Sequence, residues 1–100
     1  MIGENFIGKY VIVRTQSAAV FAGILSERDG REVLIKNARR IWYWDGAASL
    51  SQLAIDGTSK PSNCKFPEAI DSVILLDAIE IIETSEKAKL SIESVPSWKE

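Results

Sequence analysis

The dipeptide Asp29-Gly30 constrains the fold of this chain more than any other sequence feature. An apolar run precedes it at residues 20–26, and a second follows at residues 33–35. Asp-Gly between two strand-like runs is a strong hairpin signal, because both residues tolerate the positive φ angles of a tight two-residue turn. The two runs are therefore predicted to be antiparallel neighbours in one sheet.

A first strand is predicted ahead of this hairpin. Tyr10 and Ile12 would lie on one of its faces and Val11 and Val13 on the other, because side chains alternate along a strand. Within the second strand, Gly23 indicates a bulge or tight bend, which a small curved sheet requires. The first part of the chain is thus expected to form an antiparallel meander.

Two more strands are expected after the hairpin. Residues 39–44 are predicted to form the fourth strand, separated from the third by Asn37-Ala38 and closed by the turn pair Asp45-Gly46. Residues 73–82 are the most apolar segment, and their composition predicts a single long strand with a kink at Asp77-Ala78.

A short helix is predicted between these two strands. Ser49 followed by Gln52 matches a capping box, and Gly57 is suited to end the helix. Its apolar stripe would be formed by Leu50, Leu53 and Ala54. The intervening loop, residues 58–67, holds Lys60, Cys64 and Lys65.

A C-terminal helix is predicted to begin at Thr84 or Ser85 and to end before Pro96. Its apolar residues recur at helical spacing, at Ala88, Ile92 and Val95, and Trp98 is expected to fold the tail back. Residues 1–100 are therefore expected to form one α+β domain. Its core would be a small antiparallel β-barrel or strongly bent sheet of about five strands, with a short helix after strand four and the C-terminal helix.

The chain lacks most residues of common catalytic sites. It has no histidine and one cysteine, Cys64, so Ser-His and Cys-His pairs and multi-ligand zinc sites are excluded. We therefore expect no enzyme activity, no metal and no cofactor. The lone cysteine and the absence of a long apolar run favour a cytoplasmic protein without a membrane segment.

The charge distribution favours a local anion site over a long nucleic-acid track. The net charge is −2, but residues 1–65 hold nine Lys and Arg against six Asp and Glu, whereas residues 66–100 hold three against eight. A general nucleic-acid coat usually carries a basic excess over the whole domain.

The segment 39–44 carries the candidate site. Strand alternation would place Arg40, Trp42 and Trp44 on one face, where a guanidinium suits a phosphate and an indole suits a base. The helix start at Ser49 and nearby cations could complete an anion pocket. The candidate ligand-binding residues are Arg39, Arg40, Trp42, Trp44, Ser49, Lys60 and Lys65. The alternative is that the tryptophans fill the core or a subunit interface.

Two resemblances accompany this pattern. Residues 8–38, which include Phe21-Ala22-Gly23-Ile24-Leu25 and Val33-Leu34-Ile35-Lys36-Asn37-Ala38, resemble the first three strands of an Sm-like or SH3-like small β-barrel. The block at residues 38–54, with Gly57-Thr58 and Cys64-Lys65-Phe66, resembles a family of short bacteriophage and prophage proteins without an assigned activity. The second resemblance implies a viral origin, and small phage proteins often counter host defence.

Three functions are weighed on these grounds. The first is a non-enzymatic, homo-oligomeric binding protein that sequesters a small anionic nucleotide, such as a host immune signalling molecule. The second is an Sm-like or SH3-like barrel that binds RNA or DNA, and the third is an inhibitor that covers a host defence protein. The first is preferred because an Arg and Trp strand leads into a helix start and the usual catalytic groups are missing.

Overall fold

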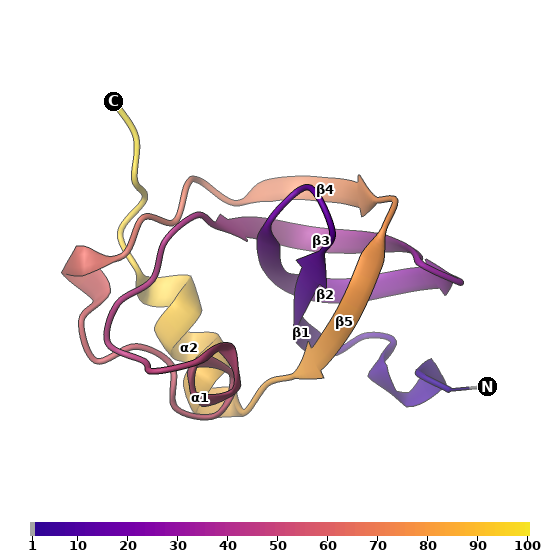
Figure 1. The fold of residues 1–100 in the computed structure, drawn as a ribbon, viewed down its shortest axis with the longest axis horizontal. Coiled ribbons are helices and arrows are strands. Elements are labelled where there is room, and N and C mark those ends of the chain that lie inside the picture. The colour runs from indigo at the N-terminus through magenta and orange to yellow at the C-terminus, as the bar shows by residue number, and fades with distance from the viewer. Residues whose placement is uncertain (1) are drawn as a thin grey trace.

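A computed structural model describes residues 2–100, and Met1 lies outside the described residues. The described chain forms five strands, two α-helices and two short 3-10 helices (Figure 1). In chain order these are η1 (Glu4–Phe6), β1 (Tyr10–Thr15), β2 (Val20–Asp29), β3 (Glu32–Ile41), α1 (Leu50–Asp56), η2 (Pro61–Asn63), β4 (Ile70–Leu75), β5 (Ala78–Glu83) and α2 (Glu86–Ser94).

The five strands form one antiparallel sheet in the order β4-β3-β2-β1-β5. β4 and β5 are separated by only Leu76 and Asp77, yet they occupy the two opposite edges of that order. A two-residue connection can join the two edges only if the sheet bends strongly, and Figure 1 shows β5 crossing the other strands at a steep angle. The predicted α+β class is therefore confirmed, with a strongly bent sheet that is not closed into a barrel.

The predicted division of β3 is wrong. Residues 32–41 form one continuous strand. Asn37 has a left-handed φ of 51°, and the strand continues to pair with β2 on both sides of it. The register shifts between Ala22 and Ile24, where Gly23 of β2 faces both Asn37 and Ala38 of β3. The irregularity predicted at Gly23 is therefore present, but the extra residue of the bulge lies in β3 and not in β2. β3 ends at Ile41, so Arg39–Trp44 is not a separate strand.

The single long strand predicted for residues 73–82 is also wrong. The chain leaves β4 at Leu75 and starts β5 at Ala78, where the kink was predicted, and the two strands pair with different partners. Continuous apolar composition could not show this break, because both strands bury part of their surface and have similar residue types.

Both α-helices match the predicted segments. The Ser49 hydroxyl accepts a hydrogen bond from the Gln52 amide at 3.1 Å, and Gly57 ends α1 with a φ of 73°. Ser85, rather than Thr84, caps α2 by accepting from the Ala88 amide at 3.0 Å. No helix within residues 2–100 is long and apolar enough to cross a bilayer.

The sheet buries side chains on both faces, as the alternation in β1 predicts. One core lies between the sheet and the helices and contains Tyr10, Ile12, Ala22, Ile41, Leu53, Ala54, Cys64, Phe66, Ile92 and Val95. The other lies inside the bend of the sheet and contains Val11, Val13, Phe21, Leu25, Val33, Ile35, Ala38, Leu75 and Ala78. Residues that follow one another in β1 therefore belong to different cores.

Candidate functional site

Arg39 lies in the interior of the protein. Its side chain is 5% exposed, and its guanidinium donates to the carbonyl oxygens of Pro67 at 3.1 Å, Phe66 at 3.2 Å and Ile92 at 2.9 Å. Burial lowers the pKa of Arg39 below its ordinary value. The Ile92 carbonyl belongs to the last turn of α2, where carbonyl groups lack partners within the helix. Arg39 thus stabilises the C-terminal end of α2.

Arg40 points away from Arg39, because neighbouring residues of a strand face opposite sides of the sheet. Its guanidinium lies over the Phe21 ring, with Cζ 4.4 Å from the ring centre, and Nη1 donates to the Ala18 carbonyl oxygen at 2.9 Å. Arg40 is therefore held against the core inside the bend, beside the β1–β2 turn.

The two tryptophans of the predicted trio have different environments. Trp44 is half-buried, packs against the core on the helix side and donates through Nε1 to the Ala47 carbonyl oxygen at 3.2 Å. The Trp42 side chain is 60% exposed. Since β3 ends at Ile41, strand alternation does not continue through both residues. The predicted common face of Arg40, Trp42 and Trp44 therefore has no strand to support it.

Exposed aromatic rings instead gather around Lys65. Tyr43 and Lys65 form an isolated antiparallel bridge, in which the Lys65 amide donates to the Tyr43 carbonyl oxygen at 2.8 Å. The Lys65 ammonium lies 6.0 Å from the centre of the Tyr43 ring and 5.6 Å from that of the Trp98 ring. Tyr43 is 49% exposed and Trp98 47% exposed. We call Tyr43, Lys65 and Trp98 the aromatic–lysine face.

Main-chain hydrogen bonds hold this face together. The Trp42 amide donates to the Lys65 carbonyl oxygen at 3.1 Å, and the Trp98 amide donates to the Phe66 carbonyl oxygen at 2.9 Å. The tail therefore folds back at Trp98, as predicted. The sequence pattern assigned Tyr43 to the other side of a strand and left Trp98 outside the site, because the pairing of Phe66 with the tail is a long-range contact.

The remaining predicted residues lie in the loops that lead into and out of α1. The Ser49 hydroxyl is used by the helix cap. The Lys60 amide donates to the Thr58 hydroxyl at 3.0 Å, and the Lys60 side chain is one of the groups that lower the pKa of Asp45. The main cause of that lowered pKa is the hydrogen bond from the Asn63 amide group to the Asp45 carboxylate at 3.1 Å. These contacts brace residues 45–46 against residues 58–63.

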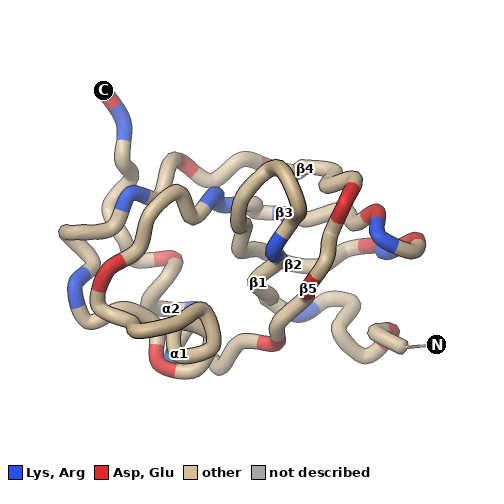
Figure 2. The backbone as a smooth tube through the Cα atoms, viewed as in Figure 1, with Lys and Arg blue, Asp and Glu red and all other residues tan. Residues whose placement is uncertain are grey.

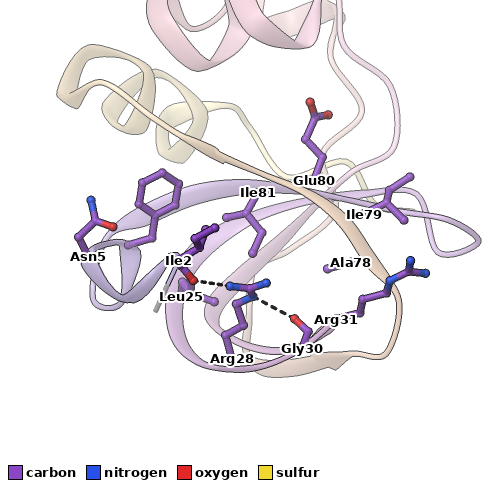
Figure 3. Close-up of a pocket in the computed structure, with 12 residues that line it drawn as sticks. Ile2, Asn5, Leu25, Arg28, Gly30, Arg31, Ala78, Ile79, Glu80 and Ile81 are labelled. Carbon is purple, nitrogen blue, oxygen red and sulfur yellow. Dashed lines mark hydrogen bonds between the residues drawn. The ribbon is translucent and has the colours of Figure 1, made fainter.

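A cavity of about 600 Å³ lies at the other end of the molecule, beside the N-terminus (Figure 3). None of the seven predicted site residues lines it. Its walls are Ile2, Gly3, Asn5, Phe6, Leu25, Arg28, Gly30, Arg31, Ala78, Ile79, Glu80 and Ile81. Sequence reasoning did not find this cavity, because its walls come from three segments that only the bend of the sheet brings together.

Charged residues do not form a continuous basic track. Figure 2 shows Lys and Arg interspersed with Asp and Glu around the tip of the β2–β3 hairpin, and acidic residues along β5. Lys65 and Lys99 lie near the C-terminus, where Lys99 pairs with Glu68 at 2.8 Å. This pattern suits a local contact with an anion better than a long run of phosphates.

These features define a class of small α+β proteins in which a strongly bent five-stranded sheet and two helices support an exposed aromatic–lysine face. The chain belongs to the family described as Domain of unknown function (DUF6948), whose model matches residues 8–92. Neither a curated protein nor a solved structure matches the chain. The matched range contains Trp42, Tyr43 and Lys65, whereas Trp98 lies beyond its end.

Proposed function

We propose that this chain is a non-enzymatic binding protein that holds a small anionic nucleotide at the aromatic–lysine face. The observation that carries the proposal is the position of the Lys65 ammonium, within 6.0 Å of the centres of two half-exposed rings, Tyr43 and Trp98. Exposed aromatic rings stack on bases, and an ammonium group pairs with phosphate. The face therefore offers both contacts that a nucleotide needs.

In this proposal three of the seven predicted site residues have a role. Lys65 contacts the ligand, together with Tyr43 and Trp98. Arg39 and Trp44 support the face from within, since both have hydrogen bonds to main-chain carbonyl oxygens and are wholly or partly buried. With the resemblance to short bacteriophage proteins, the proposal extends to a nucleotide that carries a host defence signal in the cytoplasm of an infected bacterium.

The proposal includes a homo-oligomer. β4 is an edge strand, and its Ile70 and Ile74 are 50% and 63% exposed, followed by Leu76 at 70%. An exposed edge with apolar side chains is a template for pairing with another strand. A second copy of the chain that pairs along β4 would cover these residues.

Native mass spectrometry of the purified protein tests the nucleotide proposal. The protein is incubated with cyclic oligonucleotides, cyclic ADP-ribose isomers and a short RNA, and the bound species is then released by heat. We expect an intact small nucleotide on a defined oligomer. A cleaved nucleotide would overturn the non-enzymatic assignment, and binding of RNA alone, weakening steeply with salt, would favour a nucleic-acid-binding protein.

Two variants locate the site. Lys65→Ala and Trp98→Ala should each weaken nucleotide binding at least about 10-fold, since each removes one of the two contact types. Lys87→Ala is the matched control, because it removes an exposed lysine on α2 whose distance to Asp56 is 3.8 Å. Unchanged affinity in both site variants would refute the assignment.

If no nucleotide binds, the aromatic–lysine face fits better as a contact surface for a host protein, since Trp and Tyr are enriched in interfaces.

A further inference from the structure

The cavity beside the N-terminus has an apolar interior. It lies between residues 2–6, the turn of the β2–β3 hairpin and β5, and its volume of about 600 Å³ falls within the range of small-molecule sites. Leu25 is fully buried at its base, and Figure 3 shows Ile81 directed into the same space. Phe6 contributes an aromatic side chain that packs against the core inside the bend.

The Arg28 side chain lines this cavity, and two hydrogen bonds to main-chain oxygens hold its guanidinium in place. Its Nε donates to the Gly30 carbonyl oxygen at 2.9 Å and its Nη1 donates to the Ile2 carbonyl oxygen at 2.6 Å (Figure 3). Gly3 permits the close approach of the N-terminal segment, because a Cβ atom there would lie 2.9 Å from Nη1 of Arg28. The guanidinium is thus held by two main-chain groups, and its Nη2 group donates to no acceptor in the described part of the chain.

The charge of Arg28 is not balanced by a carboxylate. Among residues 2–100 it forms no ion pair, whereas the other charged groups of the cavity wall have partners. Glu80 accepts from Arg14 at 2.9 Å, and Arg31 lies 3.6 Å from Asp77. A positioned guanidinium with unused donors, facing an apolar cavity, is suited to a carboxylate or sulfonate group.

We propose that this cavity binds a small organic anion with an apolar body. The apolar body lies against Leu25, Phe6 and Ile81, and the anionic group pairs with Arg28. This inference is independent of the proposed nucleotide function, because the cavity shares no residue with the aromatic–lysine face and lies at the opposite end of the molecule from α1 and α2 (Figure 1).

Two fluorescent probes that differ by one charged group test the proposal. The anionic probe is 8-anilinonaphthalene-1-sulfonate, and the neutral probe is N-phenyl-1-naphthylamine, which has the same ring system without the sulfonate. We expect the wild-type protein to bind the anionic probe at least about 10-fold more tightly. In Arg28→Gln this preference should fall to about two-fold or less, because the variant removes the charge that pairs with the sulfonate. Lys87→Gln on α2 should keep the full preference.

The neutral probe separates recognition from a loss of structure. If Arg28→Gln only loosened the N-terminal segment, both probes would lose affinity equally, and the proposal would be wrong. Amide chemical shifts in a ¹⁵N-labelled sample locate the anionic probe, and the largest changes are expected at Leu25, Gly30 and Ile81. Largest changes at Ile70 and Ile74 would place the probe on the exposed edge of β4 and overturn the assignment, as would an equal affinity for the two probes in the wild-type protein.

Discussion

The guanidinium of Arg39 lies beside the ring of Phe66, with Cζ 5.5 Å from the ring centre, and its Nη2 donates to the Phe66 carbonyl oxygen at 3.2 Å. Nη1 of the same group donates to the carbonyl oxygens of Ile92 at 2.9 Å and Glu93 at 3.4 Å. One side chain of β3 therefore joins the segment that carries Lys65 to the end of α2. The aromatic–lysine face depends on this connection, because Lys65 precedes Phe66 directly.

Replacing Arg39 should destabilise the whole domain. Arg39→Met keeps much of the side-chain volume but removes the hydrogen bonds to Pro67, Phe66 and Ile92, each worth about 1.5–3 kcal/mol because the donor is charged. The carbonyl oxygens of Phe66 and Ile92 keep their main-chain donors, so the loss is smaller than the sum of the three. We expect the free energy of unfolding in urea to fall by about 3 kcal/mol. Arg39→Lys should recover less than half of the loss, since an ammonium cannot reproduce the planar fork.

The matched control for this prediction is Arg31→Met. Arg31 is exposed, and its guanidinium lies 3.6 Å from Asp77 across a surface ion pair. Surface pairs of this kind contribute about 0–1 kcal/mol. If the free energy of unfolding fell as much in Arg31→Met as in Arg39→Met, the buried Arg39 would contribute no more to stability than an exposed arginine, which would contradict the prediction.

Trp44 and Trp42 should differ in how much they contribute to stability. Trp44→Ala removes a half-buried indole and its hydrogen bond to Ala47, so the free energy of unfolding should fall by about 2–3 kcal/mol. Trp42→Ala removes a side chain that is 60% exposed, and the change should stay within about 0.5 kcal/mol. Urea unfolding followed by circular dichroism measures both. Equal losses would contradict the different burial of the two indoles.

Gly23 should not tolerate a side chain. A Cβ atom there would lie 2.5 Å from Cγ2 of Ile35 and 2.7 Å from the carbonyl oxygen of Lys36. The second contact is with main chain in β3, so rotation of a side chain cannot relieve it. We expect Gly23→Ala to lower the melting temperature and to cost about 1–3 kcal/mol.

Gly30→Ala is the comparison for Gly23→Ala. Gly30 has a φ of 60°, but a Cβ atom there would meet no heavy atom within 4 Å, so only backbone strain opposes the substitution. That strain costs about 1–2 kcal/mol for an L-residue. Gly23→Ala should also change the amide shifts of Lys36 and Asn37, whereas Gly30→Ala should not. Unchanged shifts at Lys36 and Asn37 would argue against the close approach.

The sequence predicted local structure well and long-range structure poorly. The hairpin signalled by Asp29-Gly30 and the caps at Ser49 and Ser85 depend on residues within a few positions of each other, and all are present. The turn itself is shifted by one residue to Gly30 and Arg31, because Asp29 still pairs with Glu32, and the bulge opposite Gly23 lies in β3. The break between β4 and β5 depends instead on which strand each half of an apolar segment pairs with. No periodicity within the segment encodes that choice.

The same distinction applies to the sites. Lys65 was identified by residue type, but its association with Trp98 requires the tail to pair with residue 66. The cavity around Arg28 had no signal in the sequence, since an arginine beside a hairpin turn is ordinarily a solvated surface residue. Only the folded chain brings Ile2, Arg28 and Ile81 to one place.

The raised pKa of the buried Tyr10 predicts that the protein loses stability at alkaline pH. Burial, and then the charge of Glu93, raise the pKa of Tyr10 above its ordinary value of 10.0. Above about pH 10 the unfolded chain loses this proton while the folded chain keeps it, so the folded state binds more protons and its stability falls as pH rises. The contribution is fully present below about pH 10 and is lost toward the raised pKa of the folded state.

The measurement compares urea unfolding of wild-type protein and Tyr10→Phe between about pH 8 and pH 11.5, a window set by the ordinary tyrosine pKa. The free energy of unfolding of the wild-type protein should fall by up to about 1.4 kcal/mol per pH unit more than that of the variant. Lysines such as Lys99, whose pKa is raised by its hydrogen bond to Glu68, titrate in both proteins and cancel in the difference. Parallel pH profiles would mean that the Tyr10 hydroxyl reaches solvent in the folded state, and the core on the helix side would then be open at β1.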